Sequence, residues 1–308
     1  MTDPFNKDPR VEYGVAVRLA PQVRRVTAPN PSAMTFTGTQ SYIVGEGEVA
    51  VIDPGPVSAA QAQAILGALA PGERVGAILV THTHVDHSPG VAALKAATGA
   101  PSYGFGRHGA GESETMARLR ATGAEFGGGE GADRDFTPDE IMGDGAALEI
   151  GGARLTALHT PGHLSNHIAF DLAGAGVFTG DLVMGWATTL VSPPEGDMAA
   201  FMASMARMTA RDDRVFWPGH GHPVEDPAGM LAYQIGHRRS REAQIAAALG
   251  ATGEATPAAL TALIYTDVDQ RLLPMAERNV FAHLLGMITE GRVETDGEIA
   301  PGARFRLI

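Results

Sequence analysis

The run Thr81-His82-Thr83-His84-Val85-Asp86-His87-Ser88-Pro89-Gly90 decides the fold of this 308-residue chain. Three imidazoles and one carboxylate fall within six consecutive residues of it. The apolar run 75–80 that precedes them is typical of a buried β-strand, and Ser88-Pro89 favours a helix start, with Ser88 as its cap. The cluster is therefore predicted at the carboxyl end of a strand, where open α/β sheets bind their ligands.

Such a dense cluster indicates a metal site rather than a polar turn, because imidazole and carboxylate are ligands that Zn²⁺ and related cations take. His82 and His84 are two residues apart, so in extended chain they project to the same side. Asp86 and His87 follow where the chain turns, and we expect them to point to a second position nearby.

Three later segments also place a histidine or an aspartate directly after an expected strand. They are Thr160-Pro161-Gly162-His163, Thr179-Gly180-Asp181 and Pro218-Gly219-His220-Gly221. Because strand ends can meet at one edge of a sheet, side chains far apart in the sequence are expected to converge there.

The composition restricts the class of protein. The chain contains no cysteine, which excludes disulfides, thiolate metal sites and a cysteine nucleophile. Its formal net charge of −12 argues against a bulk electrostatic grip on nucleic acid. Neither an apolar signal core nor a run of about 18 apolar residues occurs, so we expect a cytoplasmic protein without a membrane span.

Read in order, the chain alternates expected strands and helices, which is typical of an α/β fold. Residues 1–24 are expected to form a loosely held arm, and residues 34–53 a β-hairpin that ends at Asp53. Asp53 is either a turn residue or a carboxylate that orients a ligand histidine. The methionines at spacings of four and three in the expected helix 197–208 indicate a core-facing side. Residues 107–140 are expected to be a long connection, either a substrate wall or an insertion without a role.

The four motifs together resemble the metallo-β-lactamase superfamily over residues 30–225. The resemblance implies an αββα sandwich, two mixed sheets face to face with helices outside, and a dinuclear site at one edge. It implies that His82, His84 and His163 hold one metal ion, that Asp86, His87 and His220 hold the other, and that Asp181 bridges them. Two divalent ions are expected, zinc first, with iron or manganese as alternatives.

The other histidines are interpreted by their position. His108, His237 and His283 are expected on the surface or on helices. His159, His167 and His222 lie next to the motifs and are candidates for supporting or substrate-contacting positions.

Residues 226–308 are predicted to form a second domain beside the catalytic domain 1–225. Expected helices at 231–249, from 256 and at 274–288, followed by strands near 291–294 and 303–307, indicate a winged-helix-type module. With this module, the chain resembles the branch that contains β-lactamase-like protein 2, an endoribonuclease, and glyoxalase II-like hydrolases. Arg238, Arg239 and Arg241 are either a solvated helix face or a contact for an anionic substrate. The segment has eight Lys and Arg against ten Asp and Glu, which argues against a basic nucleic-acid surface.

The resemblance implies hydrolysis by a metal-bridging hydroxide, with Asp86 and Asp181 holding the attacking water. The first hypothesis is a hydrolase for a small ester, thioester, lactone or related substrate. The alternatives are a phosphodiesterase for single-stranded RNA, a non-catalytic metal-binding regulatory module, and an iron-dependent dioxygenase. A homodimer is also considered.

Overall fold

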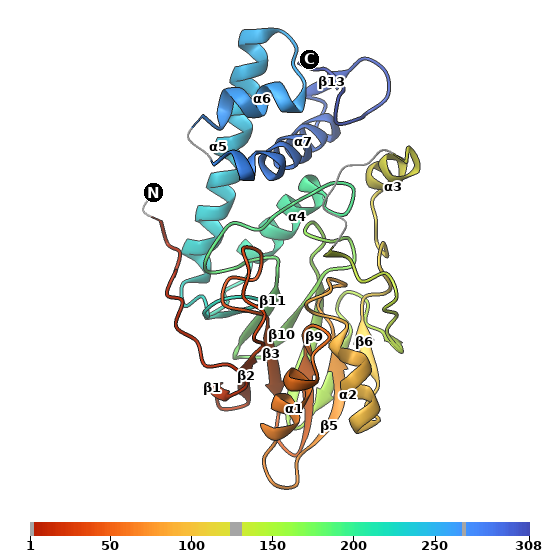
Figure 1. Cartoon of the computed structure of the whole chain (residues 1–308), viewed down its shortest axis with the longest axis vertical. Coiled ribbons are helices and arrows are strands. Elements are labelled where there is room, and N and C mark those ends of the chain that lie inside the picture. The colour runs from red at the N-terminus through yellow and green to blue at the C-terminus, as the bar shows by residue number, and fades with distance from the viewer. Residues whose placement is uncertain (1–2, 124–130, 267–268) are drawn as a thin grey trace.

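The protein is described by a computed structural model for residues 3–123, 131–266 and 269–308. Two β-sheets lie between layers of helices, and a mainly helical C-terminal unit lies above one end of them (Figure 1). Among the described helices, none has the combination of length and apolar character that a bilayer span requires.

The first sheet contains seven strands in chain order. They are β1 (Ala16–Ala20), β2 (Val23–Thr27), β3 (Gln40–Val44), β4 (Glu48–Ile52), β5 (Arg74–Leu79), β6 (Ser102–Gly104) and β7 (Glu140–Ile141). Strands β1 to β4 pair antiparallel, which confirms the β3–β4 hairpin, and β4 to β7 pair parallel. The parallel pairs need crossovers, and α1 (Ala59–Gly67) and α2 (Gly90–Thr98) supply two of them.

The second sheet has five strands in the order β12-β11-β10-β9-β8. Their bounds are β8 (Ala147–Ile150), β9 (Ala153–His159), β10 (Ile168–Leu172), β11 (Gly176–Gly180) and β12 (Phe216–Pro218). Only the β11–β12 pair is parallel, and α4 (Met198–Thr209) lies in its connection.

Burial follows the predicted layers. The central core lies between the sheets, with Tyr42 and Leu79 from the first facing Phe170 and Trp217 from the second. Helices α1 and α2 cover the outer side of the first sheet, and α4 covers that of the second. The αββα prediction is therefore confirmed. So is the methionine stripe of α4, whose members are fully or partly buried in the outer core: Met198, Met202, Met205 and Met208.

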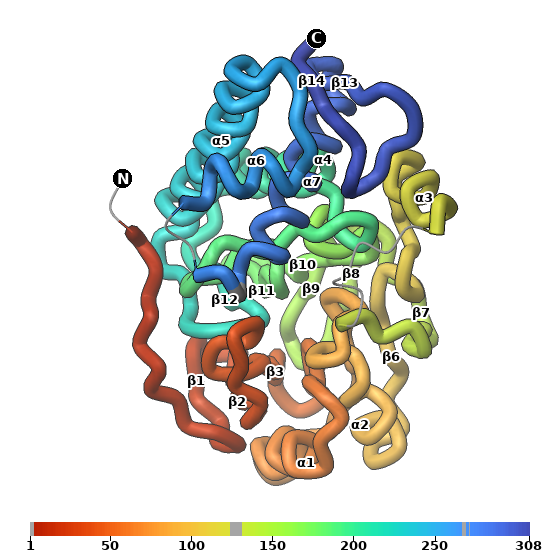
Figure 2. The backbone as a smooth tube through the Cα atoms, turned by 45° about the horizontal axis from the view of Figure 1, so that its top comes forward, coloured from red at the N-terminus to blue at the C-terminus, as the bar shows by residue number. Residues whose placement is uncertain are grey.

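The prediction of a loose arm over residues 1–24 is wrong from residue 16 onward. Strands β1 and β2 form one side of the first sheet, and Val23 is fully buried because it faces the second sheet. Ahead of them the arm runs along the outside of the molecule from α5 to β1 (Figure 2). It is fixed where the Phe5 ring meets Tyr233 at 5.3 Å and where the Asn6 N–H donates to Gly185 O at 2.8 Å. Short local signals did not reveal this pairing, because β1 is only half buried.

The C-terminal unit has the three helices and the small hairpin that the sequence predicted. They are α5 (Pro227–Thr252), α6 (Pro257–Ile264), α7 (Leu273–Thr289), β13 (Val293–Thr295) and β14 (Phe305–Leu307). Helix α5 begins four residues earlier than expected, where Asp226 caps it and Pro227 occupies its first turn. Met230 and Leu231 pack on the sandwich while Ile245 and Leu249 pack in the C-terminal core, so α5 joins the two units.

The connection 107–140 contains a helix that packs away from the sheets. Helix α3 (Glu114–Ala121) buries Met116 and Leu119 in the C-terminal core. Farther along, Gly131 lines the cavity above the motifs. The described parts of this connection therefore link the C-terminal unit to the edge of the sandwich, as Figure 1 shows for α3.

Candidate metal centre

The predicted ligands come from the carboxyl ends of three strands and from one loop. The cluster from His82 to His87 follows β5, Asp181 follows β11 and His220 follows β12. His163 lies in the loop between β9 and β10. Because these strand ends meet at one edge of the sandwich, the side chains form two adjacent groups: His82, His84, His163 and Asp181, and Asp86, His87 and His220.

The first group consists of three imidazoles that face one another. Nδ1 of His84 lies 2.9 Å from Nε2 of His82 and 3.0 Å from Nε2 of His163. Oδ2 of Asp181 lies 3.6 Å from Nε2 of His163 and 3.9 Å from Nε2 of His82. Nitrogens about 2.1 Å from one tetrahedral cation lie about 3.4 Å apart, which is close to this spacing.

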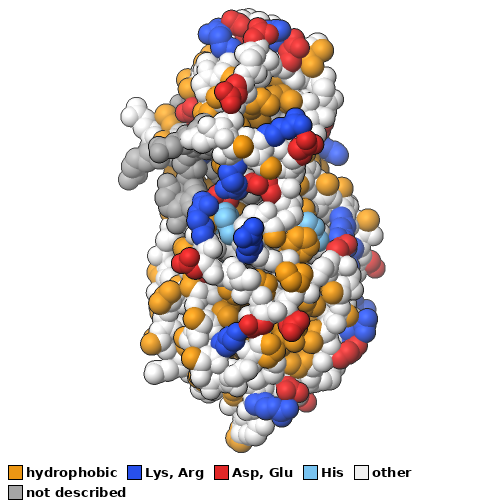
Figure 3. Space-filling view, turned by 90° about the vertical axis from the view of Figure 1, so that its right-hand side faces the viewer, with side chains coloured by type: hydrophobic (Ala, Val, Ile, Leu, Met, Phe, Trp, Pro, Cys, Tyr) orange, Lys and Arg blue, Asp and Glu red, His pale blue; other side chains and the backbone are white. Residues whose placement is uncertain are grey.

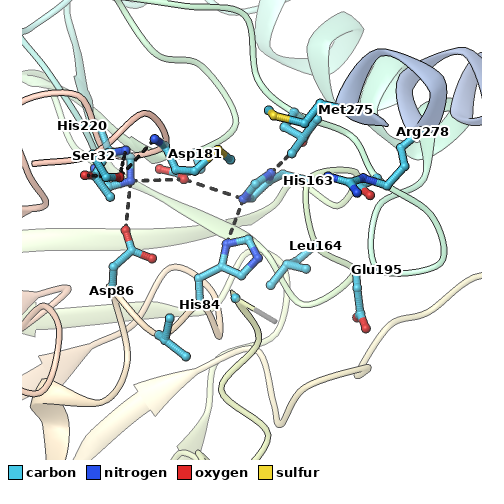
Figure 4. Close-up of a pocket in the computed structure, with 16 residues that line it drawn as sticks. Ser32, His84, Asp86, His163, Leu164, Asp181, Glu195, His220, Met275 and Arg278 are labelled. Carbon is cyan, nitrogen blue, oxygen red and sulfur yellow. Dashed lines mark hydrogen bonds and ion pairs between the residues drawn. The ribbon is translucent and has the colours of Figure 1, made fainter. Parts of the chain in front are cut away.

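The second group is equally close. Oδ2 of Asp86 lies 3.4 Å from Nε2 of His87 and 3.2 Å from Nε2 of His220, and these two nitrogens are 3.3 Å apart. The carboxylate of Asp181 reaches this group as well, with Oδ1 3.6 Å from His87 and Oδ2 3.4 Å from His220. Asp181 therefore lies between the two groups (Figure 4).

The hydrogen bonds around the first group show that it fits a cation. Nδ1–H of His82 is directed at Thr81 Oγ1, and Nδ1–H of His163 is directed at Leu190 O, at 2.9 and 2.8 Å. Both Nε2 atoms therefore carry lone pairs, and a single proton on His84 Nδ1 can satisfy only one of them. Oδ1 of Asp181 is buried without a hydrogen-bond partner in the described residues. A shared cation would satisfy all of these atoms.

Burial and charge separate the two groups electrostatically. Burial lowers the pKa of His82 well below its usual value and lowers the pKa of His84 to about 3. Burial also opposes protonation of the second pair, but Asp86 and Asp181 outweigh it, so the pKa of His87 is well raised and that of His220 rises to about 10. The first group thus retains its lone pairs, and the second attracts positive charge.

Asp53 orients one histidine of the second group through a hydrogen bond. Its carboxylate accepts hydrogen bonds from Thr81 N–H at 2.8 Å, Thr81 Oγ1–H at 2.7 Å and His87 Nδ1–H at 2.9 Å. It is 2% exposed and sits at a left-handed φ of 50° directly after β4. The arrangement fits the second of the two readings for Asp53, because a carboxylate on Nδ1 directs Nε2 toward the group. Thr81 contacts both Asp53, which orients His87, and Nδ1 of His82. The sequence did not indicate this role.

Three neighbouring histidines have positions that the sequence left open. His167 is fully buried, and its Nε2 accepts the Asp181 N–H at 3.2 Å, so it supports Asp181 and is not available for substrate contact. His159 stacks on Phe105 with ring centroids 3.8 Å apart, and His222 Nε2–H donates to Asp8 O at 2.9 Å. His222 therefore turns away toward the N-terminal arm, which corrects the expectation that it supports the site.

Other local expectations are also corrected. Ser88 does not cap α2, because its hydroxyl donates to Asp133 Oδ2 at 2.6 Å. His283 lies on the helix α7, as expected, and is fully buried there. His108 lies in a turn and its side chain is largely buried, 2.7 Å from Glu195, which corrects the expectation of a surface or helix position.

A cavity of about 400 Å³ opens above the two groups. His84, Asp86, His163, Asp181 and His220 form its floor. The walls come from six separate parts of the chain: Ser32, Met34 and Thr35; Val85; Gly131; Leu164; Leu190, Ser192 and Glu195; and Met275 and Arg278 of α7. The C-terminal unit therefore contributes directly to the site. On the face shown in Figure 3, histidine side chains lie at mid-height with Lys and Arg side chains beside them.

Glu195 on the cavity wall forms ion pairs with three side chains. Together with His108, Arg120 and Arg134 it makes up what we call the Glu195 cluster. Its carboxylate lies 2.7 Å from His108 Nε2 and 3.1 Å from both Arg120 and Arg134. Burial raises the pKa of Glu195, but hydrogen bonds from His108 and Arg120 lower it to about 2. No local sequence pattern indicated this cluster, because its members are up to 87 positions apart.

The basic trio of α5 does not form a common surface. Arg238 is 2% exposed, and its guanidinium donates to Thr189 O and, at 2.9 Å, to Asn279 Oδ1. Thr189 Oγ1–H in turn donates to Asp181 O at 2.9 Å. Arg238 therefore connects α5 and α7 to the backbone of Asp181 and belongs neither to a solvated helix face nor to a surface for an anionic substrate.

Comparison with known proteins finds two matching families along the chain. Residues 34–234 match the metallo-beta-lactamase superfamily. The chain belongs to this superfamily. Residues 256–302 match the beta-lactamase associated winged helix domain, which confirms the predicted C-terminal module.

Curated relatives of this metallo-β-lactamase superfamily protein point to hydrolases. A beta-lactamase-like protein 2 homolog from Drosophila melanogaster is 29% identical over 90% of this chain and 91% of its own length. An atrochrysone carboxyl ACP thioesterase from Aspergillus fumigatus is 30% identical over 75% of this chain and 66% of its own length. The chain is accordingly a hydrolase of this superfamily with thioesterase-like relatives.

Solved structures support the fold of both units. A beta-lactamase domain protein from Burkholderia ambifaria has a TM-score of 0.79 at 21% identity and covers 96% of this chain and 94% of its own. A metallo-beta-lactamase family protein from Thermus thermophilus has a TM-score of 0.72 at 23% identity, covering 94% of this chain and 100% of its own.

Proposed function

We propose that this superfamily member is a dinuclear metal-dependent hydrolase that cleaves a small acyl thioester. The observation that carries the proposal is the pair of His/Asp groups that share Asp181 on the floor of one cavity. His82, His84 and His163 would hold one divalent ion, and Asp86, His87 and His220 the other, with Asp181 common to both. Zinc suits a set of imidazoles and carboxylates, and iron or manganese are the alternatives.

The ions would lower the pKa of a bound water and polarise the carbonyl group of the substrate. The chain itself supplies orientation and charge. Asp86 is held by a hydrogen bond from Thr39 Oγ1 at 3.1 Å, and its carboxylate remains partly exposed to the cavity. Asp86 and Asp181 are therefore placed to accept hydrogen bonds from the attacking water and to balance the positive charge of the site.

The walls favour a small acyl substrate. Met34, Val85, Leu164, Leu190 and Met275 present apolar surface to a cavity of about 400 Å³, which lies in the range of small-molecule sites. A sulfur-linked acyl group suits such walls, and the name of the relative from Aspergillus fumigatus supports the choice of a thioester among the esters and lactones considered.

The test uses the full chain, loaded with zinc, iron or manganese and assayed for metal content. A substrate panel contains acyl thioesters, esters, lactones, a β-lactam and single-stranded RNA. We expect close to two ions per chain and fastest hydrolysis of thioesters. Asp86→Asn should lower that activity by more than about 100-fold, because losing a ligand exceeds the effect of losing one of its supporting partners.

Asp144→Asn is the matched control. Like Asp86, Asp144 is a hydrogen-bonded aspartate close to a histidine: its carboxylate accepts a hydrogen bond from the backbone N–H of His159 at 2.8 Å. It lies outside both His/Asp groups. It should leave hydrolysis unchanged. A metal-replete chain that cleaves RNA but no thioester, or that is inert on the whole panel, would contradict the proposal.

A further inference from the structure

One arginine of the C-terminal unit faces the cavity without an anionic partner among the residues that the structure describes. Arg278 lies on α7, and Figure 4 shows its side chain extending from the helix toward His163. The residue is half buried, and its buried Nε has no hydrogen-bond partner in the described residues. Burying a guanidinium without a partner is unfavourable, so a group that pairs with it from within the cavity would be stabilising.

The carboxylate on the wall of this cavity already has cationic partners. Glu195 lines the same cavity, but His108, Arg120 and Arg134 surround it. The carboxylates on the cavity floor, Asp86 and Asp181, are those assigned to the metal ions. Within the part of the chain that the structure describes, Arg278 therefore remains the cationic side chain of this cavity that no carboxylate engages.

The surroundings of Arg278 limit how far an anion can extend. Arg278 also lines a second cavity of about 210 Å³, whose walls include Pro193, Pro274 and Phe281. Glu277 lies on that second cavity and would repel an anion placed beyond Arg278. An anionic group that enters over the metal centre is thus expected to stop at the guanidinium.

We propose that Arg278 is a specificity-determining residue that binds an anionic group of the substrate, a carboxylate or a phosphate, while the scissile bond lies over the metal centre. The planar fork of N–H donors on a guanidinium matches both anions. The inference rests on the proposed thioesterase function and adds to it a substrate with one apolar portion and one anionic end. That end belongs either to the acyl group or to the thiol.

Two pairs of substrates distinguish these sources. The first pair is the butyryl and succinyl thioesters of N-acetylcysteamine, which differ in a carboxylate on the acyl side. The second is the butyryl thioesters of pantetheine and 4′-phosphopantetheine, which differ in a phosphate on the thiol side. Arg278→Met should lower kcat/KM by about 10- to 100-fold for the anionic member of one pair, the usual effect of losing a charge-assisted hydrogen bond. The neutral members should be unaffected.

Two further variants control the result. Arg278→Lys keeps the charge without the fork and should restore part of the preference. Arg239→Met removes an exposed arginine of α5 and should change neither pair. Metal content and melting temperature are measured for each variant. Equal loss on all four substrates, or no loss on either anionic substrate, would overturn the assignment of Arg278.

Ligand binding separates this inference from the proposed function. Calorimetric titration of the metal-loaded protein with succinate and with inorganic phosphate, each compared with the uncharged amide butyramide, requires no turnover. Arg278→Met should weaken the binding of one of the two anions by the same factor and leave the binding of butyramide unchanged. If the wild-type chain hydrolyses none of the thioesters, the proposed function fails, and identical binding of both anions to wild type and Arg278→Met would still refute the role of Arg278.

Discussion

Replacing Asp53 by asparagine tests how the second His/Asp group is organised. The change keeps the shape of the side chain, and asparagine tolerates the left-handed φ of 50° at this position. An amide, however, has one acceptor where the carboxylate has two. In the wild type, the carboxylate accepts a hydrogen bond from the Nδ1–H of His87 at 2.9 Å. If the amide oxygen of the new side chain continues to accept the hydrogen bond from the Thr81 N–H, its NH₂ group faces this Nδ1. The His87 proton must then move to Nε2, the atom directed at the metal position.

The expected effect is selective. Partners that support a ligand histidine usually contribute 10- to 100-fold to metal affinity, or about 1.4 to 2.8 kcal/mol. We expect Asp53→Asn to weaken the ion held by Asp86, His87 and His220 by this factor and to leave the other ion in place. The measurement is metal content per chain after dialysis against a graded series of chelator concentrations, with the melting temperature as a check on folding.

The control is Asp144→Asn, which removes a carboxylate that accepts from the His159 N–H outside the site. It should retain both ions at every chelator concentration that leaves the wild type loaded. Retention of both ions by Asp53→Asn with unchanged affinity would refute the tautomer argument. Parallel loss of both ions together with a large fall in melting temperature would show that Asp53 acts on folding instead.

Three other changes probe the support of the site. Arg238→Met removes the buried donor to Thr189 O and should lower the free energy of unfolding by about 2 kcal/mol in chemical denaturation; an unchanged value would contradict the contact. Gly162→Ala would place a methyl group 2.3 Å from the backbone of Phe201, at a φ of +140°, and should cost about 3 kcal/mol, with loss of metal at His163 as the second readout. The pKa of Glu195 is lowered to about 2, so its contribution to stability is complete above pH 4.5 and declines as the pH falls toward 2. The difference in unfolding free energy between wild type and Glu195→Gln should shrink over that interval, and a pH-independent difference would contradict the ion pairs.

Much of the sandwich could be predicted because its signals are local. The β3–β4 hairpin, the strand before His82 and the methionine stripe of α4 each depend on residues a few positions apart. Strand β1 was missed because its half-buried side chains show no clear alternation, and it becomes a strand only by pairing with β2. The start of α5 was placed late, although Asp226 and Pro227 form a recognisable capping signal.

The site shows the same division. The seven candidate ligands could be named from the sequence because each follows a strand or lies in a recognisable turn, and strand ends meet at a sheet edge. The residues that form the walls of the cavity could not be named from the sequence. Glu195 comes from the loop before α4 and Arg278 from α7, and neither segment carries a motif. Arg278 reaches the cavity only because α7 packs against the sandwich.

By itself, then, the sequence determined which side chains are suited to hold a metal ion and which strands they follow, because ligand chemistry and strand periodicity are properties of short segments. The layered arrangement of these strands was implied by the resemblance of the four motifs to a known family. The tertiary structure alone decided which of these atoms share one cavity, which histidines turn away from it, and which arginine is left facing it. Those outcomes depend on contacts between residues far apart in the chain, such as Arg238 with Thr189, and no short segment contains the information for them.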